Sequence, residues 1–284
     1  MTAPIPFAEY QQWPGVHWST LAAMGTSPLA YHEAVTTPKP PSATMELGSA
    51  IHTAILEPEL FEAEYAMYDG RKGTKAYAEW LEQQAAGVTV LSVEQYAQCM
   101  GAAEAVWCKP QGREARRVLS GARREVSIRW TDPETRIRCK ARPDIVRYHR
   151  VLTTVDRVRT VDLADVKTTA SVDARKFGKI AADLAYDGKM AFAGGGLRAL
   201  GYTVRAVKII AVEQKPPHDV AVYDVTAEVL DAGEAKVREY LARLKTCRRR
   251  RSWPGRYTGS QPLDFPRYAL PDNDMGDEIE IISR

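Results

Sequence analysis

The spacing of apolar residues divides the chain into a helical first part and a later part rich in strands. In the first 110 residues apolar positions recur at helical spacing, which predicts helices over 17–34, 45–65, 74–86 and 92–107. Ser19 starts the first helix and Pro28 interrupts it. The polar, proline-rich stretch "TTPKPPSAT" separates the first two helices.

From residue 123 onward the period of the pattern changes to two. In "RREVSIRWT" the residues Val126, Ile128 and Trp130 alternate with polar residues, which predicts a half-buried strand over 123–131. Further strands are predicted over 136–149, 160–168, 203–214 and 219–226, and helices within 172–201 and over 227–250. This order predicts an α/β fold, a mixed central sheet flanked by helices with a helical N-terminal addition.

Three segments follow from this pattern. Residues 1–110 form the mostly helical N-terminal part of the same domain, 111–255 its core, and 256–284 a C-terminal extension with an acidic tail. Gly194 to Gly196 interrupt one predicted helix and would cost it about 1 kcal/mol each relative to alanine. We expect these glycines to mark a place where another backbone approaches closely.

Composition is that of a soluble protein. The chain has 284 residues, 45% of them hydrophobic and 26% charged, which fits one large domain. No window reaches the roughly 18 to 20 apolar residues of a membrane helix, and "MTAPIPFAEY" does not resemble a signal peptide. We therefore expect a cytoplasmic protein without membrane contact. The four cysteines are scattered, a pattern that indicates neither a zinc site nor a disulfide framework.

Charge is unevenly distributed. Residues 109–150 hold 13 Lys and Arg against 5 Asp and Glu, residues 236–256 hold 9 against 1, and residues 272–284 hold 1 against 5. Basic blocks of this kind are either solvated faces or surfaces that follow a phosphate backbone. For Arg248 to Arg251 the two interpretations are equally good, because cations also favour the end of a helix.

The main chemical signal is a pair of acids on neighbouring predicted strands. Asp144 lies in "KARPDIVR", among three cations. In "LADVKTT" Asp165 and Lys167 are two positions apart and share one face of a strand, while Ala164 and Val166 point into the core. Adjacent strands would bring Asp144 beside Asp165.

Such an arrangement predicts a cation site. Two carboxylates in contact need a shared proton or a cation, and oxygen ligands suit Mg²⁺ or Mn²⁺. A bound ion could polarise a phosphodiester, and Lys167 could orient or deprotonate the attacking water, with Glu125 as a third acid. Each residue alone is more commonly a surface group or half of a salt bridge. Their joint occurrence favours metal-dependent phosphodiester hydrolysis.

At these residues the chain resembles a known group of nucleases. "RPD", twenty intervening residues and "DVK" resemble the PD-(D/E)xK signature. The wider motifs resemble the exodeoxyribonuclease VIII type of phage and prophage exonuclease, from about residue 10 to 255. In chain order they are "STLAAMGTSPLAYHEA", "LGSAIHTAILEPELFEAEY", "CKARPDIV", "LADVKTTASVDARKF" and "YDGKMAF".

The resemblance implies a restriction-endonuclease-like core and Mg²⁺-dependent digestion of linear double-stranded DNA from its 5′ ends, with Mn²⁺ able to substitute. The product, a 3′ single-stranded tail, would pass to a single-strand annealing recombinase. The resemblance also implies a ring-shaped homo-oligomer through which DNA is threaded.

Carried over by position, the resemblance assigns roles to particular residues. Lys167 is the expected catalytic lysine, and Glu125 matches the acid of the first strand. The expected metal ligands are His52, Asp144, Asp165 and the carbonyl of Val166. A lone histidine on an apolar helix is more commonly a core residue, and for His52 only the resemblance favours a ligand.

Contacts with DNA are expected from five residues, and one motif departs from the family pattern. The five are Arg123, Arg124, Arg142, Tyr186 and Lys189, and Arg142 could equally pair with a carboxylate. Where the family usually has a glutamine and then an aromatic residue, this chain has Lys189 and Ala193. A DNA-end-binding or recombinase-partner protein with weakened nuclease activity therefore remains an alternative, as does an endonuclease on the same fold.

Overall fold

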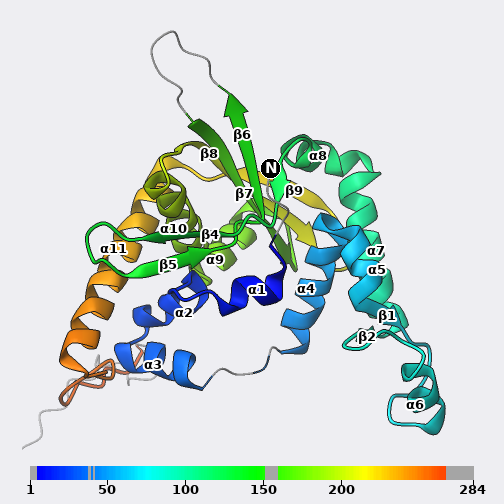
Figure 1. Cartoon of the computed structure of the whole chain (residues 1–284), viewed down its shortest axis with the longest axis horizontal. Coiled ribbons are helices and arrows are strands. Elements are labelled where there is room, and N and C mark those ends of the chain that lie inside the picture. The colour runs from blue at the N-terminus through cyan, green and yellow to red at the C-terminus, as the bar shows by residue number, and fades with distance from the viewer. Residues whose placement is uncertain (1–4, 38–39, 41, 151–158, 267–284) are drawn as a thin grey trace, which may run out of the picture.

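The structure is a computed structural model that describes residues 5–37, 40, 42–150 and 159–266 (Figure 1). The predicted acidic tail lies outside the described residues. In chain order the helices are α1 (Phe7–Gln12), α2 (Trp18–Leu21), α3 (Pro28–Thr36), α4 (Ala43–Leu56), α5 (Pro58–Glu64), α6 (Lys75–Leu81), α7 (Val93–Trp107), α8 (Arg113–Leu119), α9 (Ala174–Asp183), α10 (Tyr186–Ala199) and α11 (Ala227–Arg250). The strands are β1 (Tyr65–Met67), β2 (Thr89–Leu91), β3 (Arg123–Arg124), β4 (Ile128–Thr131), β5 (Arg138–Ala141), β6 (Ile145–Arg150), β7 (Arg159–Thr169), β8 (Thr203–Glu213) and β9 (Val220–Asp224).

A five-stranded sheet forms the centre of the molecule. Its strand order is β3-β6-β7-β8-β9, and β7 and β8 are parallel while the other neighbours are antiparallel. The parallel pair is joined through α9 and α10, as the alternation of strand and helix patterns predicts. The predicted α/β class and mixed sheet are confirmed.

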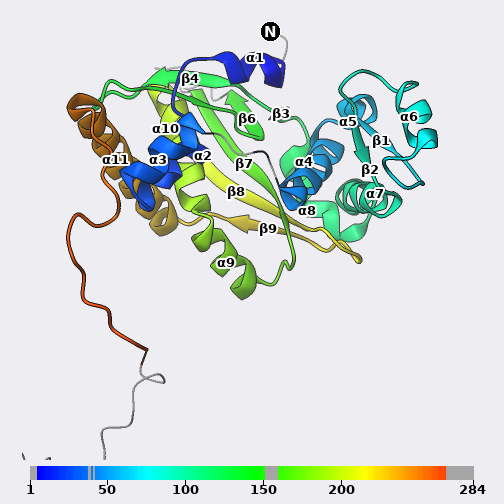
Figure 2. The same ribbon diagram turned by 90° about the horizontal axis from the view of Figure 1, so that it is seen from below.

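Helices cover both faces of this sheet (Figure 2). Val161 and Leu163 of β7 belong to one core cluster, which includes side chains of α2, α3, α10 and α11. Ala164 and Val166 belong to a second cluster, with side chains of α4, α5, α7 and α8. Because the middle of β7, from Leu163 to Val166, is buried on both faces, a charged side chain there must find a partner inside the protein. Within the described part of the chain, no helix is both long and apolar enough to span a membrane.

The strand predicted over 123–131 is broken in the structure. It forms β3 and β4, and Glu125 between them has a left-handed backbone with φ 51°. The strand predicted over 136–149 is likewise divided into β5 and β6 around Pro143, which has no N–H to donate to a ladder. Strands β4 and β5 pair with each other and leave the central sheet. A pattern with period two continues across such breaks, so it could not reveal them.

The observed helices differ from the predicted ones mainly in where they begin and end. The helix predicted over 45–65 divides into α4, capped by the Ser42 hydroxyl, and α5, which starts at Pro58. Helix α10 continues through Gly194 to Gly196. A Cβ at Gly196 would lie 2.7 Å from the indole of Trp130. The group that packs closely against this glycine is therefore a side chain, whereas a backbone segment was predicted. The short elements α1, α8, β1 and β2 were not predicted.

Candidate active site

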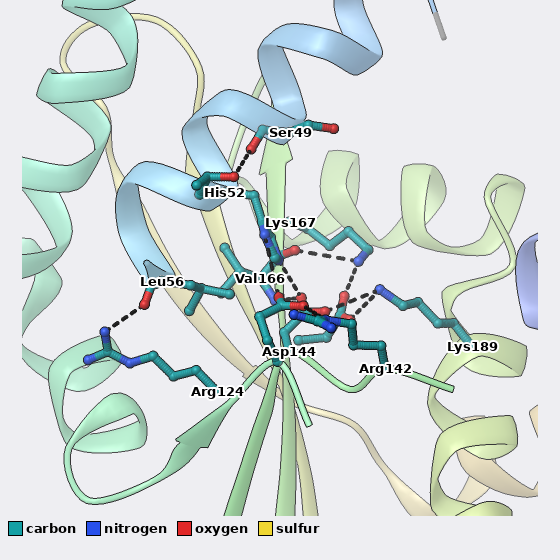
Figure 3. A network of polar contacts seen from close by, with 12 residues as sticks. Ser49, His52, Leu56, Arg124, Arg142, Asp144, Val166, Lys167 and Lys189 are labelled. Atoms are coloured by element: carbon teal, nitrogen blue, oxygen red, sulfur yellow. Dashed lines mark hydrogen bonds and ion pairs between the residues drawn. The ribbon is translucent and has the colours of Figure 1, made fainter. Parts of the chain in front are cut away.

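A cluster of charged side chains lies where α4 and α10 approach β7 and the break between β5 and β6 (Figure 3). Ile145 pairs with Ala164 across the antiparallel strands, which places Asp144 opposite Asp165. Both acids are buried, Asp144 at 4% and Asp165 at 0% exposure. Asp144 Oδ2 accepts a hydrogen bond from the Val166 N–H at 2.8 Å. The expected juxtaposition of these two acids on neighbouring strands is confirmed.

Glu125 reaches the same cluster because of the break between β3 and β4. Its N–H donates to the Asp144 carbonyl at 2.9 Å, and the next N–H, of Val126, donates to the Pro143 carbonyl at 3.0 Å. Arg142 Nε donates to Glu125 Oε2 at 2.5 Å. Burial, together with the charge of Asp144, raises the pKa of Glu125 above its ordinary value. The left-handed turn thus delivers a third carboxylate to the acids of the sheet.

His52 enters from α4, on the side of the sheet formed by the N-terminal helices. This helix approaches β7 closely, since a Cβ at Gly48 would lie 3.2 Å from Thr168 Oγ1. His52 Nε2 lies 2.9 Å from Asp144 Oδ2, and its Nδ1 lies 3.8 Å from Glu125 Oε1. Burial alone would lower the pKa of His52, but the attraction of the two carboxylates outweighs it and the pKa is raised.

Two lysines approach from the other side. Lys167 shares a face of β7 with Asp165, as predicted, and donates to Asp165 Oδ2. Its ammonium lies 3.4 Å from the Val166 carbonyl oxygen and 4.9 Å from the centre of the Tyr186 ring. Lys189, from α10, lies 2.5 Å from Asp165 Oδ1 and 3.6 Å from Asp144 Oδ1. Burial lowers the pKa of Lys167, and repulsion from Lys189 adds to that effect against the attraction of Asp165.

The donor atoms fit a divalent metal ion. One ligand atom each from His52, Glu125 and Asp144 lies within 4.8 Å of the others. Glu125 Oε1 is buried and has no hydrogen-bond partner among the described residues, so it is free to coordinate. Carboxylate oxygens with one imidazole suit Mg²⁺ or Mn²⁺. Asp165, a predicted ligand, is not part of this triad, and both of its oxygens contact lysines. The Val166 carbonyl, also a predicted ligand, faces Lys167.

Arg142, one of the five predicted DNA contacts, points into the protein. It was expected to contact either DNA or a carboxylate, and in the structure it pairs with the carboxylate of Glu125. Its guanidinium also donates to the Ile5 carbonyl at 2.7 Å and lies 5.6 Å and 6.0 Å from the ring centres of Phe7 and Tyr10. The Arg142 side chain is only 8% exposed in this arrangement. Its contact with DNA stays a prediction.

Helix α1 is a part of the site that the sequence did not reveal. The Lys140 ammonium donates to the Gln11 carbonyl at 2.8 Å and to the Tyr10 carbonyl at 3.2 Å. Burial raises the pKa of Tyr10 to about 12, so its hydroxyl stays neutral. Backbone carbonyls of residues 5–12 thus hold two cations of the "KAR" segment, Lys140 from α1 and Arg142 from Ile5 just before it. The apolar and aromatic spacing of Phe7 and Tyr10 was the available signal.

Two further predicted DNA contacts pack against aromatic rings. Arg124 donates to the Leu56 carbonyl at 2.7 Å, and its guanidinium lies 5.0 Å from the Trp107 ring centre. It therefore fixes the end of α4 and is not a free phosphate ligand. Arg123 is exposed, with its guanidinium 5.0 Å from the Tyr148 ring centre. Tyr186 begins α10 beside Lys167.

A mixed sheet that carries a buried Asp, a facing Asp and a Lys two residues later, with helices on both faces, defines a domain of the PD-(D/E)xK nuclease type. Residues 18–261 match the family described as "PDDEXK-like domain of unknown function (DUF3799)". The chain belongs to this family. No curated protein sequence matches it at a significant level.

One solved structure shares the fold. A candidate exonuclease from Eubacterium rectale is similar over 87% of this chain and 89% of its own, with a TM-score of 0.53 and 12% sequence identity. At that identity the likeness shows the fold alone. A second structure, of the protein SSO0001, matches 70% of this chain and 87% of its own with 12% identity. Its TM-score of 0.27 supports no argument.

Proposed function

We propose that the protein is a metal-dependent exonuclease that digests linear double-stranded DNA from its 5′ ends and leaves 3′ single-stranded tails. The observation that carries this proposal is the convergence of His52, Glu125 and Asp144 beside the Asp165–Lys167 pair. Residues from four separate parts of the chain meet there, and three of them are acids that would repel one another without cations.

Each residue has a role that follows from its position. A divalent ion at the triad would polarise the scissile phosphodiester and acidify a bound water. Asp165 holds the Lys167 ammonium at the end of its side chain, and the lowered pKa of Lys167 favours its acting as a proton acceptor for the attacking water. Arg142 holds Glu125 so that only Oε2 is engaged and Oε1 faces the triad.

Direction and partners rest on the resemblance described above. Exonuclease over endonuclease is favoured by that resemblance and by the description of the Eubacterium rectale neighbour as a candidate exonuclease. The proposal includes a single-strand annealing recombinase as partner and a ring-shaped homo-oligomer around the DNA. The basic blocks at 109–150 and 236–256 supply positive charge for the phosphate backbone.

The test uses linear duplex labelled at either the 5′ or the 3′ end, with Mg²⁺ or EDTA, and a closed circular duplex in parallel. Wild type should release 5′-labelled nucleotides only with metal, and Lys167→Ala should not. Lys208→Ala is the matched control, because Lys208 lies on β8 and pairs with Asp224. It should digest DNA like wild type.

Other outcomes would select the alternatives. Retained binding of DNA ends without any digestion would indicate a DNA-end-binding protein, an alternative kept open by Lys189, whose ammonium lies between the two acids. Cutting of closed circles would indicate an endonuclease. Release of 3′-labelled nucleotides first would overturn the proposed direction.

A further inference from the structure

Lys189 occupies an unusual position for a residue expected at a DNA surface. Its ammonium lies between two buried acids, 2.5 Å from Asp165 Oδ1 and 3.6 Å from Asp144 Oδ1 (Figure 3). The other oxygen of Asp144 is already engaged, since Oδ2 accepts from Val166 N–H and contacts His52. Lys189 thus takes the oxygen atom of Asp144 that the sheet and His52 leave available.

Both oxygens of Asp165 also lie beside ammonium groups. Its Oδ2 accepts a hydrogen bond from Lys167, and its Oδ1 forms an ion pair with Lys189 without a hydrogen bond of regular geometry. A metal ion at Oδ1 would therefore have to displace the Lys189 ammonium. Lys167 does not form this bridge, since its polar contacts with described residues are with Asp165 and the Val166 carbonyl. Among the described side chains that form ion pairs, Lys189 is the cation that contacts both acids of the sheet.

Basic side chains already contact every carboxylate of the site. The three acids are Asp144, Asp165 and Glu125, and their ion-pair partners are Lys167, Lys189, Arg142 and His52. Burial alone would lower the pKa of Lys189, but the attraction of the two aspartates raises it above its ordinary value. A divalent ion that binds both aspartates would have to compete with an ammonium held at short range.

We propose that Lys189 is the resident counter-ion of this active site. Its ammonium bridges Asp144 and Asp165 while no divalent ion is bound, and it releases at least one of them when an ion binds. Lys189 therefore stabilises the metal-free protein and raises the metal concentration at which the site fills. The inference rests on the proposed metal-dependent function and adds a residue that sets its metal requirement.

Titration with Mn²⁺ tests the inference, with unbound Mn²⁺ followed by electron paramagnetic resonance. Wild type is compared with Lys189→Gln and Lys189→Met, which keep the length of the side chain and remove its charge. Both variants should bind Mn²⁺ at least about tenfold more tightly, because a cation a few ångströms from the ion is gone. In EDTA both should melt at a lower temperature than wild type, and Mn²⁺ should raise their melting temperatures by more.

Lys236→Gln is the matched control. It removes another lysine–aspartate pair that involves α10, with Lys236 Nζ 2.7 Å from Asp187 Oδ2, and it leaves the acid cluster intact. Its Mn²⁺ affinity should equal that of wild type. An unchanged or weaker Mn²⁺ affinity in both Lys189 variants would overturn the inference.

The outcomes also separate this inference from the proposed function. If wild type binds Mn²⁺ and digests DNA while the Lys189 variants bind Mn²⁺ no more tightly, the nuclease stands and the counter-ion does not. If wild type binds no Mn²⁺, both fall. A crystal structure of wild type with Mn²⁺ provides a test independent of variant folding. Lys189 should have left at least one aspartate, and an ammonium still in contact with both beside a bound ion would refute the inference.

Discussion

Strand β7 carries two acid clusters of similar composition and very different character. At one end Asp162 contacts His149 at 2.7 Å and Arg205 at 2.6 Å, and the Arg205 side chain is 59% exposed. About 10 Å further along the strand, Asp165 belongs to the buried cluster with Asp144. Both clusters combine a histidine, a cation and an aspartate.

The difference lies in the number of acids and in burial. Asp162 is one carboxylate with two partners at the surface, an arrangement that is complete without any ligand. The buried cluster gathers three acids, and two of their oxygens, Glu125 Oε1 and Asp165 Oδ1, have no hydrogen-bond partner among the described residues. The number of acids buried together, and the oxygens among them that lack a hydrogen-bond partner, distinguish the candidate metal site from an ordinary salt bridge, although both contain the same types of residue.

The largest expected effect separates the two aspartates of β7. Asp165→Asn should reduce nuclease activity by about 10² to 10⁴-fold, because the Lys167 ammonium loses the carboxylate that positions it. Asp162→Asn should stay within about twofold of wild type, since it lies in the surface cluster. Initial rates on labelled linear duplex measure both, with circular dichroism to confirm folding. Equal losses in both variants would contradict the distinction drawn here.

Lys189 and Arg205 should differ in how much each stabilises the metal-free protein. Lys189→Gln should lower the free energy of unfolding by about 2 to 4 kcal/mol in EDTA, because two buried acids lose a shared cation. Arg205→Gln removes an exposed cation and should cost less than about 1 kcal/mol. Urea denaturation of the three proteins in EDTA measures these values. A smaller loss for Lys189→Gln than for Arg205→Gln would reverse the expected order.

His52 and His149 should differ in how much each contributes to stabilisation by Mn²⁺. Mn²⁺ at about 100 times its Kd should stabilise wild type by about 2.7 kcal/mol, since the ion binds the folded form. His52→Ala should reduce this gain at the same Mn²⁺ concentration because one ligand of the triad is lost. His149→Ala should keep it. Thermal melts with and without Mn²⁺ provide the measurement, and an undiminished gain in His52→Ala would remove His52 from the site.

The smallest expected effect is the loss of the Asp162 contribution to stability at low pH. Burial favours the neutral form of Asp162, but its hydrogen bonds to Arg205 and His149 hold its pKa below the ordinary 3.8. Its contribution to stability is therefore present above pH 3.8 and is lost as the pH falls through the lowered pKa. Wild type should exceed Asp162→Asn by about 0.5 to 1 kcal/mol at pH 6, and the gap should narrow below pH 4. Denaturation at several pH values measures the gap, and a constant gap would contradict this linkage.

Much of the fold was predictable because the spacing of apolar residues along the sequence matches the faces of the helices and strands that are buried. Strands β7 and β8 and helices α7 and α11 have the residues expected from apolar spacing, and the Asp165–Lys167 pair followed from the two-residue repeat of a strand. Alternation also placed Ala164 and Val166 in the core correctly. These inferences are local, since each depends on the conformation of a single strand or helix.

The rest depended on contacts between distant segments or on backbone irregularity. The left-handed conformation of Glu125 carries no residue signature, because this residue type rarely adopts it. Arg142 looked like a DNA contact because nothing in its own segment predicts a tether to Ile5. Lys189 was expected to touch phosphate, and its place between Asp144 and Asp165 requires the packing of α10 on the sheet.

Helix α1 contributes no metal ligand, yet the shape of the pocket depends on it. Arg142 binds the Ile5 carbonyl with one part of its guanidinium and Glu125 with another, so a change in the first segment is passed to an acid of the triad. A protein made without residues 5–12 would leave Arg142 and Lys140 without these carbonyls, and Glu125 would lose its fixed orientation. Substitutions at Phe7 or Tyr10 should therefore affect the active site, although both residues precede the "RPD" motif by more than a hundred positions.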